Sequence, residues 1–290
     1  MKSAPFEYHR PESVSEALAL LSGFENARVL AGGQSLMAMM NMRYAQVDHL
    51  IDLNRISDLA DIRRHGDALH VGAMVRQRVL LTSPLVKEHS PLLIEALSNV
   101  GHIQTRSRGT IGGSLCHLDP AAELPATLLA LDASVILRRA DGERRVDIDD
   151  WFQGFMTPNL QPGEILTEIC IPRATGRCGY AFLEVSRRKG DFALGGVACL
   201  VKVQDKKISN AVVTVMGLGV RPQRLNAGEA KMIGEVPSPA LFKAVADRVE
   251  DVEILADYYS DRSYKITLGK TLVSRALQKA VERAAGHHHE

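Results

Sequence analysis

Two glycine-rich turns are the parts of this sequence best suited to hold a ligand. The first is LAGGQSL at residues 30–36, and the second is GTIGGS at residues 109–114. Glycine lets a backbone approach a ligand closely, and consecutive exposed N–H groups form a concavity that binds anions. One such turn is a weak signal. Two of them, the second followed by acidic residues, indicate a diphosphate held from two sides with its ribose nearby.

The two turns offer different donors. In the first turn, we expect the backbone amides and the Ser35 hydroxyl to bind the diphosphate, and Leu36 to pack on the adenine or ribose side. In the second turn, the expected donors are the Thr110 hydroxyl and the amides of Gly113 and Ser114. An isolated Gly-Gly pair is more often a tight turn between a strand and a helix, but the second turn favours ligand binding.

The polar residues after the second turn leave alternatives open. Asp119 precedes a proline and a predicted helix, so an N-cap role stands beside ligand contact. His117 is equally compatible with facing the diphosphate and with capping the loop. Metal binding by Cys116 and His117 is not expected, because no further ligands are spaced to help them.

Several motifs, spread over most of the chain, resemble the flavin-binding medium subunit of the molybdenum hydroxylases. That family includes the medium chain of carbon monoxide dehydrogenase, the quinoline and nicotinate dehydrogenases, and the flavin region of xanthine dehydrogenase. The matching motifs follow the family's order: AGGQSL at 31–36, VGAM at 71–74, TIGGS at 110–114, DPAAELPA at 119–126, LTEICIP ending at Pro172, and RRKGDFAL at 187–194.

The resemblance implies a set of FAD-binding residues. Val100 and Gly101 match positions beside the flavin ring; they also fit an ordinary helix end at glycine, and both interpretations can hold together. Glu123 matches the acidic residue that binds the ribose hydroxyls. Phe192 is the candidate for controlling access to the ring, and a core position between two strands is its alternative. The full predicted set is Ala31, Gly32, Gly33, Gln34, Ser35, Leu36, Val100, Gly101, Thr110, Gly112, Gly113, Ser114, His117, Asp119, Glu123, Leu166, Asp191 and Phe192.

The elements that position these residues predict an α+β fold. Ser13-x-x-Glu16 is a capping box before a helical apolar pattern, and a strand over 27–31 leads into the first turn. The fingerprint G-x-G-x-x-G is missing from this unit, which disfavours a classical dinucleotide-binding fold. Asp141-Gly142 predicts a hairpin between strands at 134–139 and 144–148.

The second half of the chain predicts a separate unit. A linker over 172–179 precedes three strands and then three helical segments, which is typical of an α+β domain. The resemblance implies a two-part FAD-binding domain of the PCMH (vanillyl-alcohol-oxidase-like) type, over 1–56 and 57–174. A C-terminal domain over 179–290 combines a three-stranded antiparallel sheet with three helices.

Composition limits the partners. The net charge of +1 argues against nucleic acid, and neither a membrane-spanning run nor a signal peptide is present, so a cytoplasmic location is expected. The four cysteines lack the spacing of an iron–sulfur or zinc site. No catalytic or metal-binding residue is predicted on this chain, which fits a subunit whose chemistry belongs to its cofactor.

The resemblance therefore implies an electron-transfer subunit. Electrons pass from molybdopterin on a large partner to [2Fe-2S] clusters on a small partner. FAD on this chain receives the electrons from these clusters and passes them to an external acceptor. A dimer of heterotrimers is the expected assembly. Two alternatives are a self-contained FAD-dependent oxidoreductase and a non-catalytic flavin-binding or assembly protein.

Overall fold

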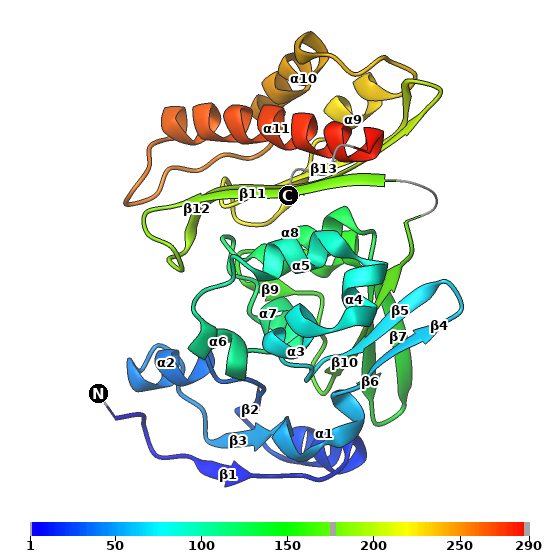
Figure 1. Cartoon of the computed structure of the whole chain (residues 1–290). Coiled ribbons are helices and arrows are strands. Elements are labelled where there is room, and N and C mark those ends of the chain that lie inside the picture. The colour runs from blue at the N-terminus through cyan, green and yellow to red at the C-terminus, as the bar shows by residue number, and fades with distance from the viewer. Residues whose placement is uncertain (1, 175–177, 287–290) are drawn as a thin grey trace.

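Three larger β-sheets, stacked in chain order, organise the protein (Figure 1), and strands β8 and β9 of the middle region form a separate two-stranded sheet. A computed structural model describes residues 2–174 and 178–286. Below, the N-terminal region is 2–59, the middle region is 62–174, and the C-terminal region is 178–286. The predicted linker lies partly outside the described residues, at 175–177. Among the described helices, none is long and apolar enough to cross a bilayer.

The N-terminal region is a small parallel sheet in the order β1-β3-β2. The Ser13 half of the predicted capping box is present, because the Ser13 hydroxyl accepts from the Glu16 amide at 3.1 Å. The Glu16 carboxylate accepts from the Glu12 amide at 2.8 Å, one residue before the N-cap amide that a capping box uses. The elements are β1 Glu7–His9, α1 Val14–Gly23, β2 Ala27–Leu30, α2 Leu36–Asn41, β3 His49–Asp52, η1 Leu53–Arg55 and η2 Ser57–Leu59.

An antiparallel sheet in the order β4-β5-β10-β6-β7 forms the base of the middle region. The predicted hairpin is present, with its turn shifted by one residue because Arg139 pairs with Gly142. The strands are β4 Ile62–His65, β5 Ala68–Gly72, β6 Ser134–Arg139, β7 Gly142–Asp147, β8 Phe152–Gly154, β9 Thr157–Pro158 and β10 Ile165–Pro172.

Short helices cover this sheet and carry the second glycine turn between them. Ser83 and Ser90 each precede a proline in the first helical position, a tolerated place for proline. The helices are α3 Gln77–Thr82, α4 Pro84–His89, α5 Pro91–Leu97, α6 Ile103–Arg108, α7 Ile111–His117, α8 Glu123–Ala130 and η3 Ile148–Trp151.

The C-terminal region is an antiparallel meander covered by helices on its outer face (Figure 1). The predicted three strands and three helical segments are present, and a short strand, β14, is added at the edge of the sheet. The elements are β11 Cys178–Ser186, β12 Ala193–Gln204, β13 Lys207–Met216, β14 Gln223–Arg224, α9 Asn226–Met232, α10 Pro239–Ala246, η4 Asp247–Asp251 and α11 Arg262–Ala285.

Helices α5 and α8 of the middle region pack on the inner face of this meander. Glu95 on α5 accepts hydrogen bonds from Lys279 and Arg283 on α11, the latter at 2.8 Å, and from the Phe182 amide at 3.2 Å. Burial alone would raise the pKa of Glu95, but the two cations outweigh it and lower that pKa. The middle and C-terminal regions therefore share a partly buried ionic contact as well as apolar packing.

Candidate functional site

The first glycine turn leaves a row of backbone donors without partners. It follows β2, with Gly33 at a φ of +73°, a conformation that favours glycine. Within the described residues, the amides of Gly32, Gly33, Gln34 and Ser35 have no hydrogen-bond acceptor. The Ser35 hydroxyl is likewise not used to cap α2. This turn therefore has the free donors that an anion requires.

The second turn has a different hydrogen-bond pattern. Thr110 is the N-cap of α7, and its hydroxyl accepts from the Gly113 amide at 3.0 Å. The Ser114 amide donates to the Thr110 carbonyl at 3.2 Å, and the Gly112 amide donates to the Ala73 carbonyl at 2.9 Å. The amides of Gly113 and Ser114, expected as ligand donors, are thus engaged within the protein. The hydroxyl proton of Thr110 remains for a ligand.

The two turns nevertheless lie against each other. A Cβ atom built on Gly32 would fall 2.4 Å from the Arg108 carbonyl oxygen and 2.8 Å from Gly109 Cα. A Cβ on Gly113 would lie 3.4 Å from the Cβ of Ala31. Only glycine at position 32 permits this approach of the two backbones. The prediction that both turns belong to one site agrees with this geometry.

A polar network behind the turns holds them in place, and the sequence analysis missed it. The side-chain amide of Asn54 donates to the Ala31 carbonyl at 2.9 Å. The backbone amide of Asn54 donates to the Asp52 carboxylate at 2.8 Å. Arg76 donates both to the Asn54 side chain and to the Arg108 carbonyl. Burial, and then the neighbouring Arg108, lower the pKa of Arg76. The available signal was Asp-x-Asn directly after an apolar strand.

The segment after α7 turns sharply before α8 begins. Leu118 has a left-handed φ of +51°. The Asp119 carboxylate accepts from the Ala121 amide at 2.9 Å, while the N-cap of α8 is Ala122. The predicted helix-capping role of Asp119 is therefore wrong, because the residue caps the turn instead. Burial lowers the pKa of His117, and Asp119 opposes this.

Glu123 opens α8 as a carboxyl group in an unusual electrostatic setting. Burial is the main cause that raises its pKa to about 8, and the nearby carboxylates of Glu184 and Asp119 raise it further, while Arg106 opposes them. A protonated carboxyl group both donates and accepts a hydrogen bond. Glu123 is thus chemically suited to a ribose hydroxyl pair, and its role there stays a prediction.

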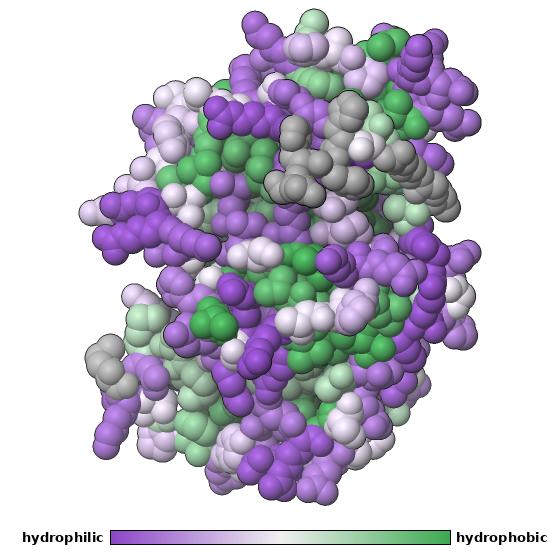
Figure 2. All heavy atoms as spheres, in the orientation of Figure 1, coloured by the Kyte–Doolittle hydropathy of each residue, from purple (hydrophilic) through white to green (hydrophobic). Residues whose placement is uncertain are grey.

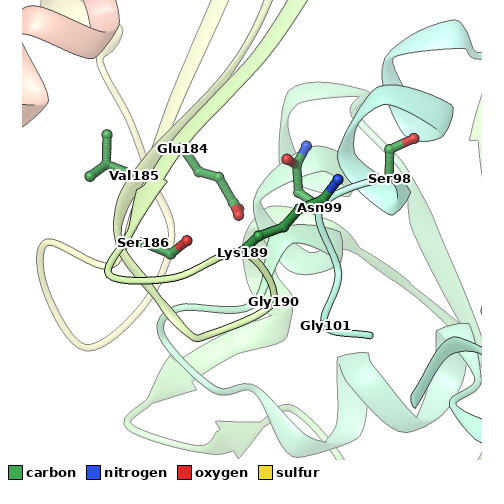
Figure 3. A pocket seen from close by; sticks show the side chains of 8 residues that line it. All are labelled: Ser98, Asn99, Gly101, Glu184, Val185, Ser186, Lys189 and Gly190. Carbon is green, nitrogen blue, oxygen red and sulfur yellow. The ribbon is translucent and has the colours of Figure 1, made fainter. Parts of the chain in front are cut away.

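A pocket of about 390 Å³ lies between the middle and C-terminal regions. Figure 2 shows the outline of the molecule indented on the side of the loop that joins β11 to β12. Glu184 and Asn99 approach the pocket from opposite walls (Figure 3). The lining residues are Ser98, Asn99, Gly101, Glu184, Val185, Ser186, Lys189 and Gly190.

Glu184 is the unusual side chain of this pocket. Its Oε2 atom is buried without a hydrogen-bond partner among the described residues. Burial raises the pKa of Glu184 to about 7. A buried polar atom without a partner costs stability, so such atoms are expected where a ligand or water completes the contacts.

Two loops from different regions meet at the mouth of this pocket. Arg106 donates to the carbonyls of Val100 and Gly101, at 2.7 and 2.9 Å, and so fixes that turn. A Cβ atom on Gly190 would fall 2.3 Å from the ring of His102. The structure therefore brings predicted positions 100 and 101 close to the loop that carries Asp191 and Phe192.

Phe192 and Leu166, two of the predicted FAD-binding residues, have contrasting environments. The side chain of Phe192 is 73% exposed, so its alternative interpretation as a core residue is wrong. Leu166 on β10 is 4% exposed and packs within the core of the middle region. Its predicted contact with the cofactor, like the other predicted ligand contacts, stays a prediction.

Comparison with known proteins identifies the family. The family model described as "FAD binding domain in molybdopterin dehydrogenase" matches residues 4–174, and "CO dehydrogenase flavoprotein C-terminal domain" matches residues 180–280. The chain belongs to the FAD-binding medium subunits of the molybdenum hydroxylases. The resemblance seen in the sequence motifs is confirmed.

Individual relatives align over nearly their whole length. The 6-hydroxypseudooxynicotine dehydrogenase complex subunit alpha of Paenarthrobacter nicotinovorans is 38% identical, over 98% of this chain and 97% of the relative. The carbon monoxide dehydrogenase medium chain of Hydrogenophaga pseudoflava is 36% identical, over 97% and 98%. A solved carbon monoxide dehydrogenase structure from that organism superposes with a TM-score of 0.95, covering 98% of this chain and 99% of the other.

These findings confirm the predicted α+β fold and FAD as the cofactor of this oxidoreductase subunit. The chain's own geometry fits that cofactor. The four amides of the first turn that lack an acceptor among the described residues lie beside the backbone of 108–109, which only a glycine at position 32 can approach so closely. A pocket lies beside the loops that the sequence motifs assign to the flavin ring.

Proposed function

We propose that this subunit transfers electrons from iron–sulfur clusters on a partner chain, through its FAD, to an external acceptor. FAD supplies the redox chemistry when bound. The observation that carries the proposal is the row of free amides at 32–35, which the Arg76 network joins to the second turn. Family membership and the exposed Phe192 loop support an acceptor-facing cofactor.

We assign the residues around FAD by the contacts each can make. The amides of 32–35 and the hydroxyls of Ser35 and Thr110 hold the diphosphate, because they are donors without a better partner in the protein. Glu123 binds the ribose hydroxyls. Val100, Gly101, Asp191 and Phe192 border the flavin ring at the pocket between the regions.

The proposed assembly contains a large molybdopterin chain and a small [2Fe-2S] chain, paired as a dimer of heterotrimers. Relatives are named as medium chains, or as alpha and beta subunits of dehydrogenases, which supports a multisubunit enzyme. Because the family's flavin domain is defined within molybdopterin dehydrogenases, the remaining redox centres belong on other chains.

Rapid-reaction spectroscopy of the complex purified from its host tests this path. FAD is removed by mild chaotropic salt. We then expect that substrate still bleaches the iron–sulfur absorbance but that acceptor reduction stops. Adding FAD back should restore acceptor reduction. If the isolated FAD-loaded subunit oxidises the substrate by itself, the self-contained oxidoreductase is correct. If FAD removal leaves acceptor reduction unchanged, the proposed path is wrong.

A further inference from the structure

Strands β1 and β3 lie side by side in the N-terminal sheet (Figure 1). Three side chains with metal-binding atoms gather on one face of these two strands. Glu7 and His9 are two residues apart on β1, so both project from the same face. The parallel register pairs Glu7 with His49 on β3, which places His49 on that face too. The sheet itself therefore assembles the cluster.

The distances within the cluster fit a tetrahedral ion. His9 Nε2 and His49 Nδ1 are 3.2 Å apart. Glu7 Oε2 lies 3.4 Å from His49 Nδ1 and 3.9 Å from His9 Nε2. Two ligand atoms that are each about 2.0–2.1 Å from a tetrahedral zinc ion lie roughly 3.4 Å from each other. The three atoms thus approximate one face of a zinc tetrahedron.

The surroundings orient the two rings and leave the carboxylate available. Phe24 stacks on His49 with ring centroids 4.0 Å apart, and on His9 at 4.8 Å. In the described part of the chain, no lysine or arginine pairs with Glu7, whose side chain is 72% exposed. Among the described residues, the two imidazoles are the only ion-pair partners of this largely exposed carboxylate.

A second group of candidate ligands provides a contrast. His70, Glu168 and Cys170 also lie close together. There, Arg63 already donates to Glu168, and that carboxylate also contacts His70. Burial alone would raise the pKa of Glu168, but its hydrogen bonds with His70 and Arg63 lower it. That cluster is balanced by the protein's own cation, whereas the cluster on β1 and β3 is not.

We propose that Glu7, His9 and His49 bind a divalent transition-metal ion of the zinc type, with the fourth position open to water. Imidazole nitrogen and carboxylate oxygen are ligands that zinc accepts. The ion cross-links β1, a short edge strand, to β3 and so stabilises the N-terminal region. Binding weakens in acid because a protonated imidazole cannot coordinate.

Calorimetric titration of EDTA-treated protein with zinc chloride tests the site. The background protein carries His287→Ala, His288→Ala and His289→Ala, because these tail histidines would otherwise bind zinc as well. We expect one zinc ion per chain. His9→Gln and His49→Gln should each weaken binding at least about tenfold, and His65→Gln, an exposed histidine elsewhere, should leave it unchanged.

Zinc-edge X-ray absorption identifies the ligands. We expect a nitrogen and oxygen shell at about 2.0–2.1 Å without sulfur. A sulfur shell would assign the metal to the Cys170 cluster and overturn the proposal, as would an absence of zinc binding or an unchanged zinc affinity in both histidine variants relative to the background protein. If a histidine variant fails to fold by circular dichroism, Glu7→Ala provides the test instead, because that side chain is largely exposed.

Discussion

The two glycine turns look alike in sequence and differ in what their backbones do. Among the described residues, the amides of 32–35 have no acceptor, whereas amides of the turn at 110–114 donate to Thr110, Ala73 and Val75. The first is a set of donors for an anion. The second is mainly a device that lets α7 start close against a neighbouring backbone. The same dipeptide thus leaves donors free in one place, where we propose that it binds the diphosphate, and serves packing in the other.

Close packing explains why the second turn needs glycine. A Cβ atom on Gly112 would fall 2.6 Å from the Cβ and 2.7 Å from the carbonyl oxygen of Ala73. A Cβ atom on Gly33 would meet only side chains, the nearest being the flexible Met37, whose Cγ would lie at 3.2 Å, and the main requirement at this position is a positive φ. Glycine is therefore demanded by space at Gly112 in the second turn and at Gly32 in the first, and by backbone conformation at Gly33.

The largest expected effect is that of Gly112→Ala on stability. The added methyl group collides with buried backbone, so we expect a loss of roughly 3 kcal/mol in the free energy of unfolding. Urea unfolding of the FAD-free protein measures this. Gly142→Ala is the control, since a Cβ there meets nothing within 4 Å. Equal stability of the two variants would contradict the packing role.

Gly33→Ala should instead act on FAD. We expect a loss of about 1 kcal/mol in stability from the positive φ, and at least about tenfold weaker FAD binding because the row of amides is displaced. Gly66→Ala is a matched control, with a φ of +58° and open space around it, away from the site. Flavin fluorescence titration compares the two; equal FAD affinities would remove the first turn from the site.

Thr110 tests whether the second turn contributes to binding at all. Thr110→Val removes the hydroxyl that caps α7, which should cost about 1 kcal/mol, and should weaken FAD binding by up to about tenfold if the hydroxyl also donates to the diphosphate. Thr110→Ser keeps both functions. A stability loss without any change in FAD affinity would make the second turn purely structural.

The raised pKa values of Glu184 and Glu123 predict that the stability of the FAD-free protein depends on pH. Burial raises the pKa of Glu184 from 4.5 to about 7, so the folded state holds a proton that the unfolded state releases. This contribution is fully present below pH 4.5 and is lost as the pH rises towards 7. Glu123 acts similarly, with a pKa of about 8.

Glu184→Gln should therefore flatten the decline in stability between pH 5 and pH 7. Urea unfolding at these two pH values measures the slope, and Glu143→Gln on the exposed hairpin serves as the control. An unchanged slope in Glu184→Gln would show that this carboxyl titrates alike in the folded and unfolded states.

The smallest expected effect on stability is that of Phe192→Ala. Because the ring is 73% exposed, its removal should change the free energy of unfolding by less than about 0.5 kcal/mol. We expect altered reoxidation of the reduced flavin, since the loop borders the pocket. Stopped-flow absorbance measures this rate; an unchanged rate would place Phe192 away from the acceptor's path.

Local signals in the sequence identified most of the regular elements. The Ser13 cap of α1 and the meander after 178 depend on neighbouring residues, so they were predictable. Strand β1 was missed because three residues carry too little periodicity, and its existence depends on pairing with β3. The helix cap at Asp119 was misplaced because turn and cap use the same residue types.

By itself, the sequence determined the family, the cofactor and the two glycine turns, because these reside in short contiguous motifs. Tertiary structure alone decided which amides are free, because an amide's partner is often distant in sequence, as with Gly112 and Ala73. It also decided the Arg76 network and the burial of Glu184 between two regions. Hydrogen bonding and desolvation depend on the three-dimensional neighbours that folding supplies.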